Sequence, residues 1–301
     1  MKQSLRRLLL TLCVVAVSTT SALGQGFSTS ISGQYRVVPN ITYQTANNFE
    51  AKLDVYSRSD ATTPRPTVLW IHGGGWTGGN KESATFALLP YLEMGWNVVN
   101  VEYRLARISL APAAVEDCLC ALRWVIRNAK QYGFDTDKLV VSGGSAGGHL
   151  ALTTAMIPAS VGLDRQCPGT EELKVAAVVD WYGITDVADL LDGANMKTYA
   201  VQWMGSMPDR AEIARRVSPL TYVRAGLPPV ISIQGDADPT VPYSHSVRLQ
   251  EALKKAGVDG QLVTIPGGKH GGFTRAENQG AYTAIKAFLA KHGLGPTVSS
   301  N

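Results

Sequence analysis

Short apolar runs recur along the chain, and most of them are hydrophobic at nearly every position. They are "TVLWIHG" (67–73), "NVVNVEYR" (97–104), "KLVVSG" (138–143), "VAAVVDWYG" (175–183), "PVISIQGD" (229–236) and "QLVTIPGG" (261–268). Continuous runs of this length are typical of strands that are buried on both faces of a sheet. Two earlier segments, 31–45 and 49–58, are rich in β-branched and aromatic residues and predict two further strands.

Helix-like stretches separate most of the predicted strands. They cover residues 81–94, 113–131, 146–157, 244–256 and 276–292. Strands that alternate with helices indicate a mostly parallel sheet with helices on both faces. The sequence therefore predicts an α/β fold with a central eight-stranded sheet, formed as a single domain over residues 25–293.

One connection is too long for a plain crossover between neighbouring strands. Residues 184–227 contain several short helix-like pieces, "VADLLDG", "KTYAVQWMG" and "AEIARRV". We expect them to form a small helical, cap-like insert at the edge of the sheet, where it would wall the substrate site. The last residues, 294–301, are expected to form a flexible tail.

The first segment, residues 1–24, has a different character. Basic residues (Lys2, Arg6 and Arg7) precede the apolar run "LLLTLCVVAV" and the small residues of "STTSALG". This order is typical of a secretory signal peptide, with cleavage after Gly24 or Ala22. An apolar core of about ten residues is too short to span a bilayer. We therefore expect an exported protein, periplasmic or extracellular, with no stable membrane anchor.

The net charge gives no indication of an anionic partner. The whole chain of 301 residues carries a formal charge of +4, and residues 1–24 contribute three of the positive charges with no acidic residue. About +1 remains on the rest of the chain, so the charge does not favour nucleic-acid binding. The sequence says nothing about the oligomeric state.

Three cysteines remain after the predicted signal peptide. Cys118 falls on an apolar helical stripe with Val115, Leu122 and Val125, so we expect it to be a small buried residue. Cys120 falls on the polar side of the same helix. It could pair with Cys167 in an oxidising compartment if the loop "DRQCPG" comes close, and the sequence leaves this pairing open.

The stretch "KLVVSGGSAGGHLAL" carries the clearest chemistry. An apolar strand leads into Gly143-Gly144-Ser145-Ala146-Gly147 and then directly into a helix. This is the G-x-S-x-G pattern in the strand–turn–helix context that exposes a nucleophilic serine at a sharp turn. A helix that begins directly after Ser145 would also direct backbone N–H groups and the positive end of its dipole at the reacting centre.

A nucleophilic serine needs a base and an acid, and in this motif class they follow in the order serine, acid, histidine. The strand "PVISIQGD" is followed by "ADPTVP", which offers Asp236 and Asp238, and local chemistry does not choose between them. The strand "QLVTIPGG" is followed by "KHGGF", which offers His270 as the general base.

The other histidines fit this role less well. His149 lies one helical turn after Ser145 and is expected to pack within that helix. His245 lies at the start of a helix, where we expect a surface or capping residue. His292 belongs to the terminal helix.

The glycine-rich stretch "IHGGGWTGGN" (71–80) supports two interpretations. Gly73, Gly75 and Gly78 fit G-x-G-x-x-G, the pyrophosphate-binding fingerprint, and Glu102 ends the next strand, as that fingerprint requires. The same loop fits the His-Gly-Gly-Gly oxyanion loop of esterases. Only the second interpretation also accounts for the serine, acid and histidine pattern.

Together, "HGGGW", "VEYRLA", "GGSAGG", "GDADPTVP" and "PGGKHGGF" resemble the α/β-hydrolase superfamily. The resemblance is closest to exported esterases of the bifunctional feruloyl/acetyl-xylan esterase-like and hormone-sensitive-lipase-like groups, and it covers roughly residues 50 to 293. It implies that Asp238 is the acid of the triad. It also implies that the backbone N–H groups of Gly73, Gly74 and Ala146 form the oxyanion hole, and that His72 braces the loop.

Two departures favour the feruloyl/acetyl-xylan-esterase-like group. Gly144 stands where hormone-sensitive-lipase-like proteins usually carry an acidic residue before the serine, and the usual acidic residue after "YRLA" is missing.

The sequence thus predicts a serine carboxylesterase that acts on small or polysaccharide-linked esters without a metal or organic cofactor. Ser145, Asp238 and His270 are the expected catalytic residues. Trp76 is expected either to line the substrate pocket or to cap the core. An arylformamidase-type or peptidase-type serine hydrolase is the nearest alternative. A binding protein that retains the fold and a dinucleotide-binding protein are more remote.

Overall fold

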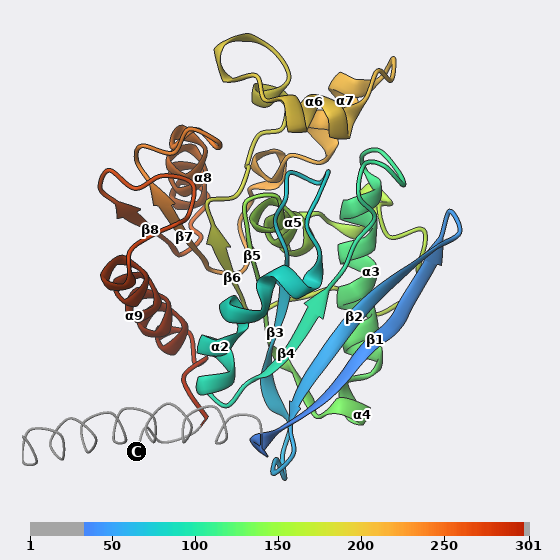
Figure 1. Ribbon diagram of the computed structural model, residues 1–301, viewed down its shortest axis with the longest axis vertical. Helices are drawn as coiled ribbons and strands as arrows, with labels where there is room; N and C mark the ends of the chain where they lie inside the picture. The colour runs from blue at the N-terminus through green and yellow to red at the C-terminus, as the bar shows by residue number, and fades with distance from the viewer. Residues whose placement is uncertain (1–32, 298–301) are drawn as a thin grey trace, which may run out of the picture.

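A computed structural model describes residues 33–297 of the chain. Within this part, eight strands form one sheet in the order β1-β2-β4-β3-β5-β6-β7-β8 (Figure 1). The strands are β1 (Tyr35–Ala46), β2 (Phe49–Arg58), β3 (Arg65–Ile71), β4 (Asn97–Val101), β5 (Phe134–Gly144), β6 (Ala177–Trp181), β7 (Val230–Gly235) and β8 (Gly260–Ile265). The β1–β2 and β2–β4 pairs are antiparallel and all later pairs are parallel. The predicted eight-stranded, mostly parallel sheet is therefore confirmed.

Helices cover both faces of this sheet (Figure 1). The α-helices are α2 (Thr85–Glu93), α3 (Ala113–Arg127), α4 (Ala129–Tyr132), α5 (Ala146–Met156), α6 (Thr198–Met204), α7 (Arg210–Arg216), α8 (Ser244–Lys255) and α9 (Arg275–Lys291). Short 3-10 helices are η1 (Lys81–Ala84), η2 (Ala159–Val161), η3 (Ala188–Leu190), η4 (Gly193–Asn195) and η5 (Pro219–Tyr222). The core on one face includes residues of α3, α5 and α8, and the core on the other face includes residues of α2 and α9.

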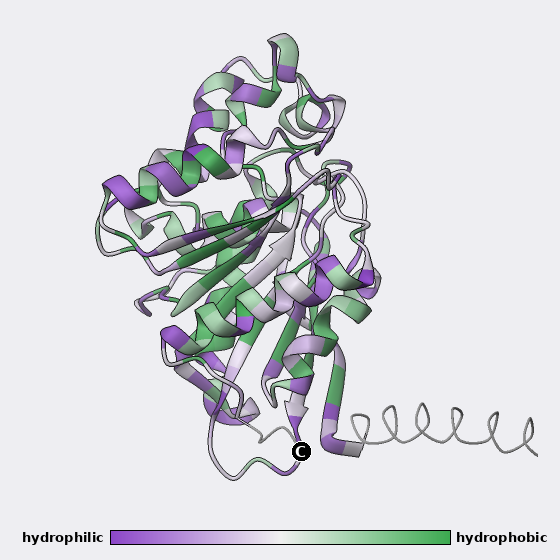
Figure 2. Ribbon diagram, turned by 90° about the vertical axis from the view of Figure 1, so that its left-hand side faces the viewer, coloured by the Kyte–Doolittle hydropathy of each residue, from purple (hydrophilic) through white to green (hydrophobic). Residues whose placement is uncertain are grey.

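The apolar runs of the sequence supply both cores at once. Along β3, Leu69 and Ile71 belong to the first core, whereas Val68 and Trp70 belong to the second. Successive side chains of a strand point to opposite faces, so a strand buried on both faces is apolar at most of its positions. Figure 2 shows these strands as a predominantly hydrophobic layer between more polar helices.

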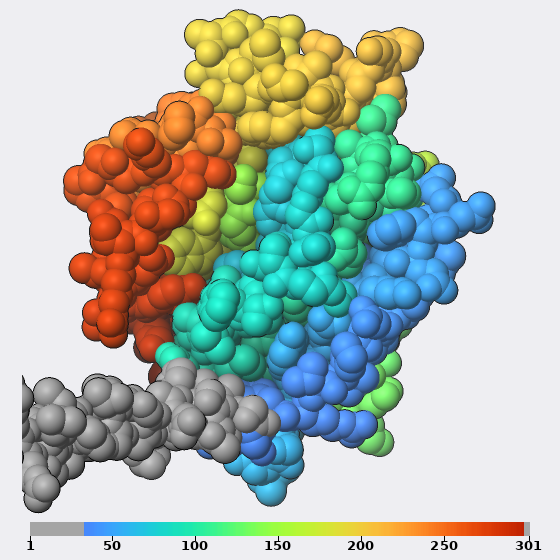
Figure 3. All heavy atoms as spheres, viewed as in Figure 1, coloured from blue at the N-terminus to red at the C-terminus, as the bar shows by residue number. Residues whose placement is uncertain are grey.

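The insert, residues 184–227, contains the predicted short helices and forms one end of the molecule, drawn in yellow at the top of Figure 3. It connects β6 to β7, which are hydrogen-bonded neighbours inside the sheet. The expectation that it lies at the sheet edge is therefore wrong, because it sits above the carboxyl ends of interior strands. Ala200, Trp203 and Ala214 are fully buried and extend the first core into the insert.

Part of the expected flexible tail is packed. Leu294 is buried, and the Thr297 N–H donates a hydrogen bond to the Met94 carbonyl. The prediction that a flexible tail begins at residue 294 is thus wrong for residues 294–297. The predicted signal peptide and residues 298–301 lie outside the described residues.

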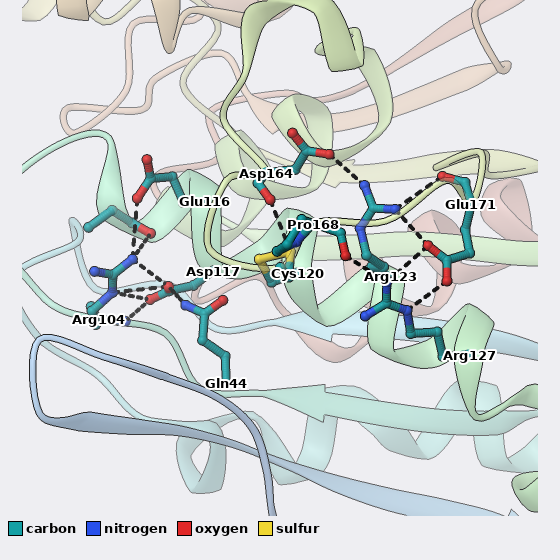
Figure 4. Close-up of a disulfide and its surroundings, with 12 residues drawn as sticks. Gln44, Arg104, Glu116, Asp117, Cys120, Arg123, Arg127, Asp164, Pro168 and Glu171 are labelled. Atoms are coloured by element: carbon teal, nitrogen blue, oxygen red, sulfur yellow. Dashed lines mark hydrogen bonds and ion pairs between the residues drawn. A yellow bond between two sulfur atoms is a disulfide. The ribbon is translucent and has the colours of Figure 1, made fainter.

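A disulfide joins Cys120 to Cys167 and holds the segment 162–175 over α3 (Figure 4). Beneath this segment, Arg123 pairs with Asp164 and with Glu171. The polar side of α3 is therefore covered by the loop, and both Cys120 and Arg123 are buried. Cys118 is a free, buried cysteine, as its position on the apolar stripe predicts.

Candidate active site

Ser145 occupies a sharp turn between the end of β5 and the start of α5. Its φ of 59° lies in the left-handed region, which is unfavourable for a residue with a side chain. A hydrogen bond from the Ser145 N–H to the Trp181 carbonyl (2.8 Å) fixes this backbone. A Cβ atom on Gly147 would lie 2.1 Å from the Ile71 carbonyl oxygen, so the turn requires glycine there.

The structure brings Ser145, His270 and Asp238 together from three different loops. His270 Nε2 lies 2.8 Å from Ser145 Oγ, and His270 Nδ1 lies 2.7 Å from Asp238 Oδ2. With a neutral imidazole, the Nδ1 N–H donates to the carboxylate and Nε2 accepts from the serine hydroxyl. This is the hydrogen-bonded order that prepares a serine as a nucleophile.

The surroundings of Asp238 keep its carboxylate ionised. Its side chain is fully buried, and its Oδ1 accepts hydrogen bonds from the N–H groups of Thr240 and Val241. Burial raises the pKa of Asp238, whereas the hydrogen bonds from His270 and the two N–H groups lower it. The lowering is larger, so the pKa of Asp238 lies below its ordinary value.

The alternative acid, Asp236, does not reach the histidine in this arrangement. Its Oδ1 accepts a hydrogen bond from the Gly267 N–H, and the residue is exposed. The structure therefore favours Asp238 over Asp236, the choice that local sequence chemistry left open.

The glycine loop that follows β3 lies directly against the serine. A Cβ atom on Gly73 would lie 2.7 Å from the Gly144 carbonyl oxygen and 3.4 Å from Ser145 Cβ. Gly74 has a φ of 115°, and a Cβ there would lie 2.1 Å from the Gly78 oxygen. Ala146 is the first residue of α5, so its N–H has no acceptor within the helix. Gly73 and Ala146 thus lie directly beside Ser145, and Gly74 lines the same cavity. Their part as oxyanion-hole donors stays a prediction.

His72 supports this loop from the buried side. Its Nδ1 lies 2.7 Å from the Gly73 carbonyl oxygen, and its ring stacks on Tyr103 with 4.3 Å between the ring centroids. Burial lowers the pKa of His72 to about 4, so the ring is neutral at physiological pH. These contacts suit the bracing role that the family resemblance implies.

The structure gives the competing dinucleotide fingerprint little support. A Cβ atom on Gly78 would meet its nearest neighbour only at 3.9 Å, so the third glycine of that pattern is not required by its surroundings. Gly73 and Gly74, in contrast, leave no room for a side chain.

A cavity of about 450 Å³ opens over Ser145 and His270. Its further lining includes Trp70, Tyr182, Tyr199 and Thr240. Neither tyrosine was predicted from the sequence. Tyr182 directly follows β6, the strand beside the nucleophile strand, so its position was a usable signal. Tyr199 comes from the insert, and no sequence pattern pointed to it.

Trp76 does not line this cavity. It is fully buried, stacks on Trp203 at 4.1 Å between ring centroids, and donates a hydrogen bond from its indole N–H to His149 Nδ1. Of the two roles that the sequence left open for Trp76, the structure supports the core role and contradicts the pocket role.

The other histidines are structural. His149 is buried within α5, where it contacts the Val217 carbonyl, and burial lowers its pKa to about 3. His245 is also fully buried and accepts a hydrogen bond from the Thr185 N–H. The expectation of a surface or capping role for His245 is wrong, because the insert covers the start of α8.

The fold and this site define a class: the chain is an α/β-hydrolase with a serine–histidine–aspartate triad at the carboxyl ends of its parallel strands. The BD-FAE family model matches residues 53–253. The chain belongs to the BD-FAE family.

Known relatives agree with this assignment. The esterase LipQ of Mycobacterium tuberculosis is 31% identical over 69% of this chain and 51% of its own length. The esterase 2 of Thermogutta terrifontis, solved with butyrate bound, has a TM-score of 0.73 and 28% identity, covering 88% of this chain and 97% of that one. A truncated carbohydrate esterase from gut microbiota has a TM-score of 0.74 and 25% identity, covering 86% and 97%.

The chain spans about half the length of the curated relative LipQ. In the part of the chain that the structure describes, no helix combines the length and apolar character needed to cross a membrane.

Proposed function

We propose that this protein is a serine carboxylesterase that cleaves small carboxylic esters through an acyl-enzyme intermediate. The observation that carries the proposal is the continuous hydrogen-bonded chain from Ser145 through His270 to Asp238, opening into a cavity beside the glycine loop. The named relatives are esterases, which supports the same reaction class.

Each group has a defined part in the reaction. Ser145 Oγ attacks the ester carbonyl while His270 Nε2 takes its proton, and Asp238 stabilises the imidazolium that forms. The N–H groups of Gly73, Gly74 and Ala146 stabilise the negative charge on the carbonyl oxygen. His270 then returns the proton to the departing alcohol. Water, activated by the same histidine, releases the acid and regenerates the serine.

We propose short acyl, acetyl or aryl esters as substrates, either free or attached to a polysaccharide. A cavity of about 450 Å³ suits a small ester. The butyrate bound to the related esterase 2 and the carbohydrate esterase among the solved relatives support this range.

We also propose that the protein is exported. The basic, apolar and small-residue order of residues 1–24 supports export, and so does the Cys120–Cys167 disulfide, because disulfides persist in oxidising compartments. Fractionating cells that express the full chain, with the N-terminus of the mature protein determined by mass, tests this point. A full-length protein retained in the cytoplasm contradicts it.

The activity is tested by comparing wild type with Ser145→Ala on aryl esters of increasing acyl length, methyl ferulate and acetylated xylan. Matched formamides and peptides are included as amide substrates. We expect wild type to hydrolyse the esters, with the highest kcat/KM for short acyl groups, and the variant to lose at least about 10³-fold in kcat. Full activity in the variant contradicts the mechanism, and a preference for the amides contradicts the ester assignment.

A further inference from the structure

A second hollow of about 350 Å³ lies beside the catalytic cavity. Its lining is mainly aromatic side chains and glycine, and it includes Trp70, Phe86, Ala87, Trp181, Tyr182 and Phe273. Figure 3 shows a hollow at this place, between the teal atoms of α2 and the red atoms of α9. We call it the aromatic hollow.

The aromatic hollow is continuous with the catalytic cavity. Trp70, Ala87 and Tyr182 line both spaces. The Tyr182 ring packs edge-on against His270, with 4.7 Å between ring centroids, and against Phe273 at 5.9 Å. A substrate bound at Ser145 can therefore extend past Tyr182 into the aromatic hollow without leaving the surface of the site.

The hollow lies on the histidine side of the nucleophile. Its wall includes the three residues that directly follow His270, residues 271–273, whereas Gly73 and Gly74 line only the catalytic cavity. In acyl transfer the departing alcohol must lie next to the histidine, since it receives its proton from that ring. The carbonyl oxygen must instead face the oxyanion donors.

We propose that the aromatic hollow is the subsite for the alcohol part of the ester, with Phe86 and Phe273 as its specificity-determining residues. This inference rests on the proposed esterase function and adds to it the position and chemistry of the leaving group.

The lining defines the chemistry of this alcohol. None of its residues is charged, which disfavours an anionic or cationic group. Phe86 on α2 is 85% exposed, against at most 49% for the other exposed large hydrophobic residues of the described chain. Aromatic faces stack on uncharged aryl rings and pack against apolar C–H surfaces, such as one face of a pyranose chair. The hollow therefore fits an alcohol that carries a ring, either aryl or pyranose.

An alcohol subsite has a kinetic signature that an acyl subsite lacks. The alcohol leaves when the acyl-enzyme forms, so it is absent during hydrolysis of that intermediate. Substitutions in the aromatic hollow should therefore change acylation by ring-bearing esters but not deacylation. Substitutions in an acyl subsite would change both steps.

The test uses the variants Phe86→Ala and Phe273→Ala, with Val37→Ala as a control on β1, where the side chain is also exposed (48%). Each enzyme is assayed on esters of one acid, acetate, with methanol, benzyl alcohol and a methyl glycoside as alcohols. Comparing each substrate between enzymes removes its intrinsic reactivity. Deacylation is measured separately by rapid mixing with p-nitrophenyl acetate.

We expect the two phenylalanine variants to lower the ratio of kcat/KM for the ring-bearing esters to that for methyl acetate about tenfold. The benzyl and glycoside arms show whether the favoured ring is aryl or sugar. Deacylation should change less than twofold in the same variants, and Val37→Ala should keep the wild-type ratio. Because Phe86 is exposed, Phe86→Ala is not expected to impair folding.

The proposal is overturned if the ratio of kcat/KM values is unchanged in both phenylalanine variants. It is also overturned if deacylation becomes slower in these variants, because that result would assign the hollow to the acyl group. These outcomes differ from failure of the esterase assignment itself. That failure would appear as Ser145-independent cleavage of methyl acetate, or none, by the wild-type enzyme.

Discussion

Asp236 and Asp238 are separated by one residue and have opposite surroundings. The carboxylate of Asp238 is fully buried against His270, whereas Asp236 is exposed and accepts from the Gly267 N–H. Of the two, only Asp238 contacts His270, so in the proposed mechanism it is the carboxylate that holds the imidazole in the tautomer that accepts the serine proton. The proposed triad therefore depends on this difference between two neighbouring carboxylates.

We expect Asp238→Asn to lower kcat by about 10³- to 10⁴-fold, because an amide at this position favours the wrong tautomer of His270. Asp236→Asn serves as the matched control and should cost less than about tenfold. Steady-state kinetics on a short aryl ester measures both effects. The reverse ranking would transfer the acid role to Asp236.

Asp180 is a second buried carboxylate, outside the triad. It accepts hydrogen bonds from the Gly183 N–H and the Ser232 hydroxyl, which fixes the turn that carries Tyr182. Burial raises the pKa of Asp180 from its ordinary value of 3.8 to about 6. The folded state therefore holds this proton more tightly than the unfolded chain does, and the free energy of unfolding falls as pH rises from about 4 to 6.

Asp180→Asn should remove this dependence, since the amide carries no charge. Its oxygen can accept from the Gly183 N–H, and its NH2 group can donate to the Ser232 hydroxyl oxygen. About two pKa units correspond to about 3 kcal/mol, so the variant should gain up to that amount relative to wild type on going from pH 4 to pH 7. Urea unfolding at both pH values measures the difference. A constant difference between the two proteins would show that Asp180 does not titrate in this range.

At the scale of elements, the strand–turn–helix unit from β5 to α5 depends on glycines that the neighbouring β3 touches. The backbone of Gly147 packs on the Ile71 carbonyl so closely that no Cβ fits. This local requirement was predictable from sequence, because G-x-S-x-G has meaning only between a strand and a helix.

Gly147→Ala should therefore destabilise the protein by more than about 2 kcal/mol and lower activity through displacement of Ser145. The control is Gly280→Ala on the exposed side of α9, where a Cβ meets nothing within 4 Å. That change should stabilise the helix by about 0.5–1 kcal/mol. Chemical denaturation of both variants checks the opposite signs. If both variants changed the free energy of unfolding equally, close packing at the turn would not be the reason for glycine at position 147.

The Cys120–Cys167 disulfide also stabilises the fold at the scale of elements, because it joins α3 to the loop that covers it. It closes a loop with a sequence separation of 47 residues, and a loop of this size contributes up to about 4 kcal/mol through the unfolded state. The double variant Cys120→Ala/Cys167→Ala should lose stability of that order in urea unfolding. Dithiothreitol should destabilise wild type and leave the double variant unchanged. An identical unfolding midpoint for wild type and the double variant would contradict this role.

At the scale of the whole molecule, the loops that carry Ser145, Asp238 and His270 lie at one end of the parallel sheet, and the insert covers that end. The strands and the triad order were predictable because each leaves a local pattern, an apolar run or a motif at a strand end. The packing of Trp76 against Trp203, the burial of His245 and the entry of Tyr199 into the cavity were not. All three depend on where the insert packs against the rest of the molecule. The sequence of its short helices contains no pattern that predicts this position.

The proposed mechanism requires that Ser145 becomes covalently acylated during turnover. Rapid-quench intact-mass analysis with p-nitrophenyl acetate tests it most directly, with peptide mapping to locate the modified residue. We predict a burst of nitrophenol close to one equivalent of enzyme and a transient acetyl group on Ser145, which Ser145→Ala abolishes. An acetyl group on another residue, or undiminished turnover in Ser145→Ala, would contradict the account.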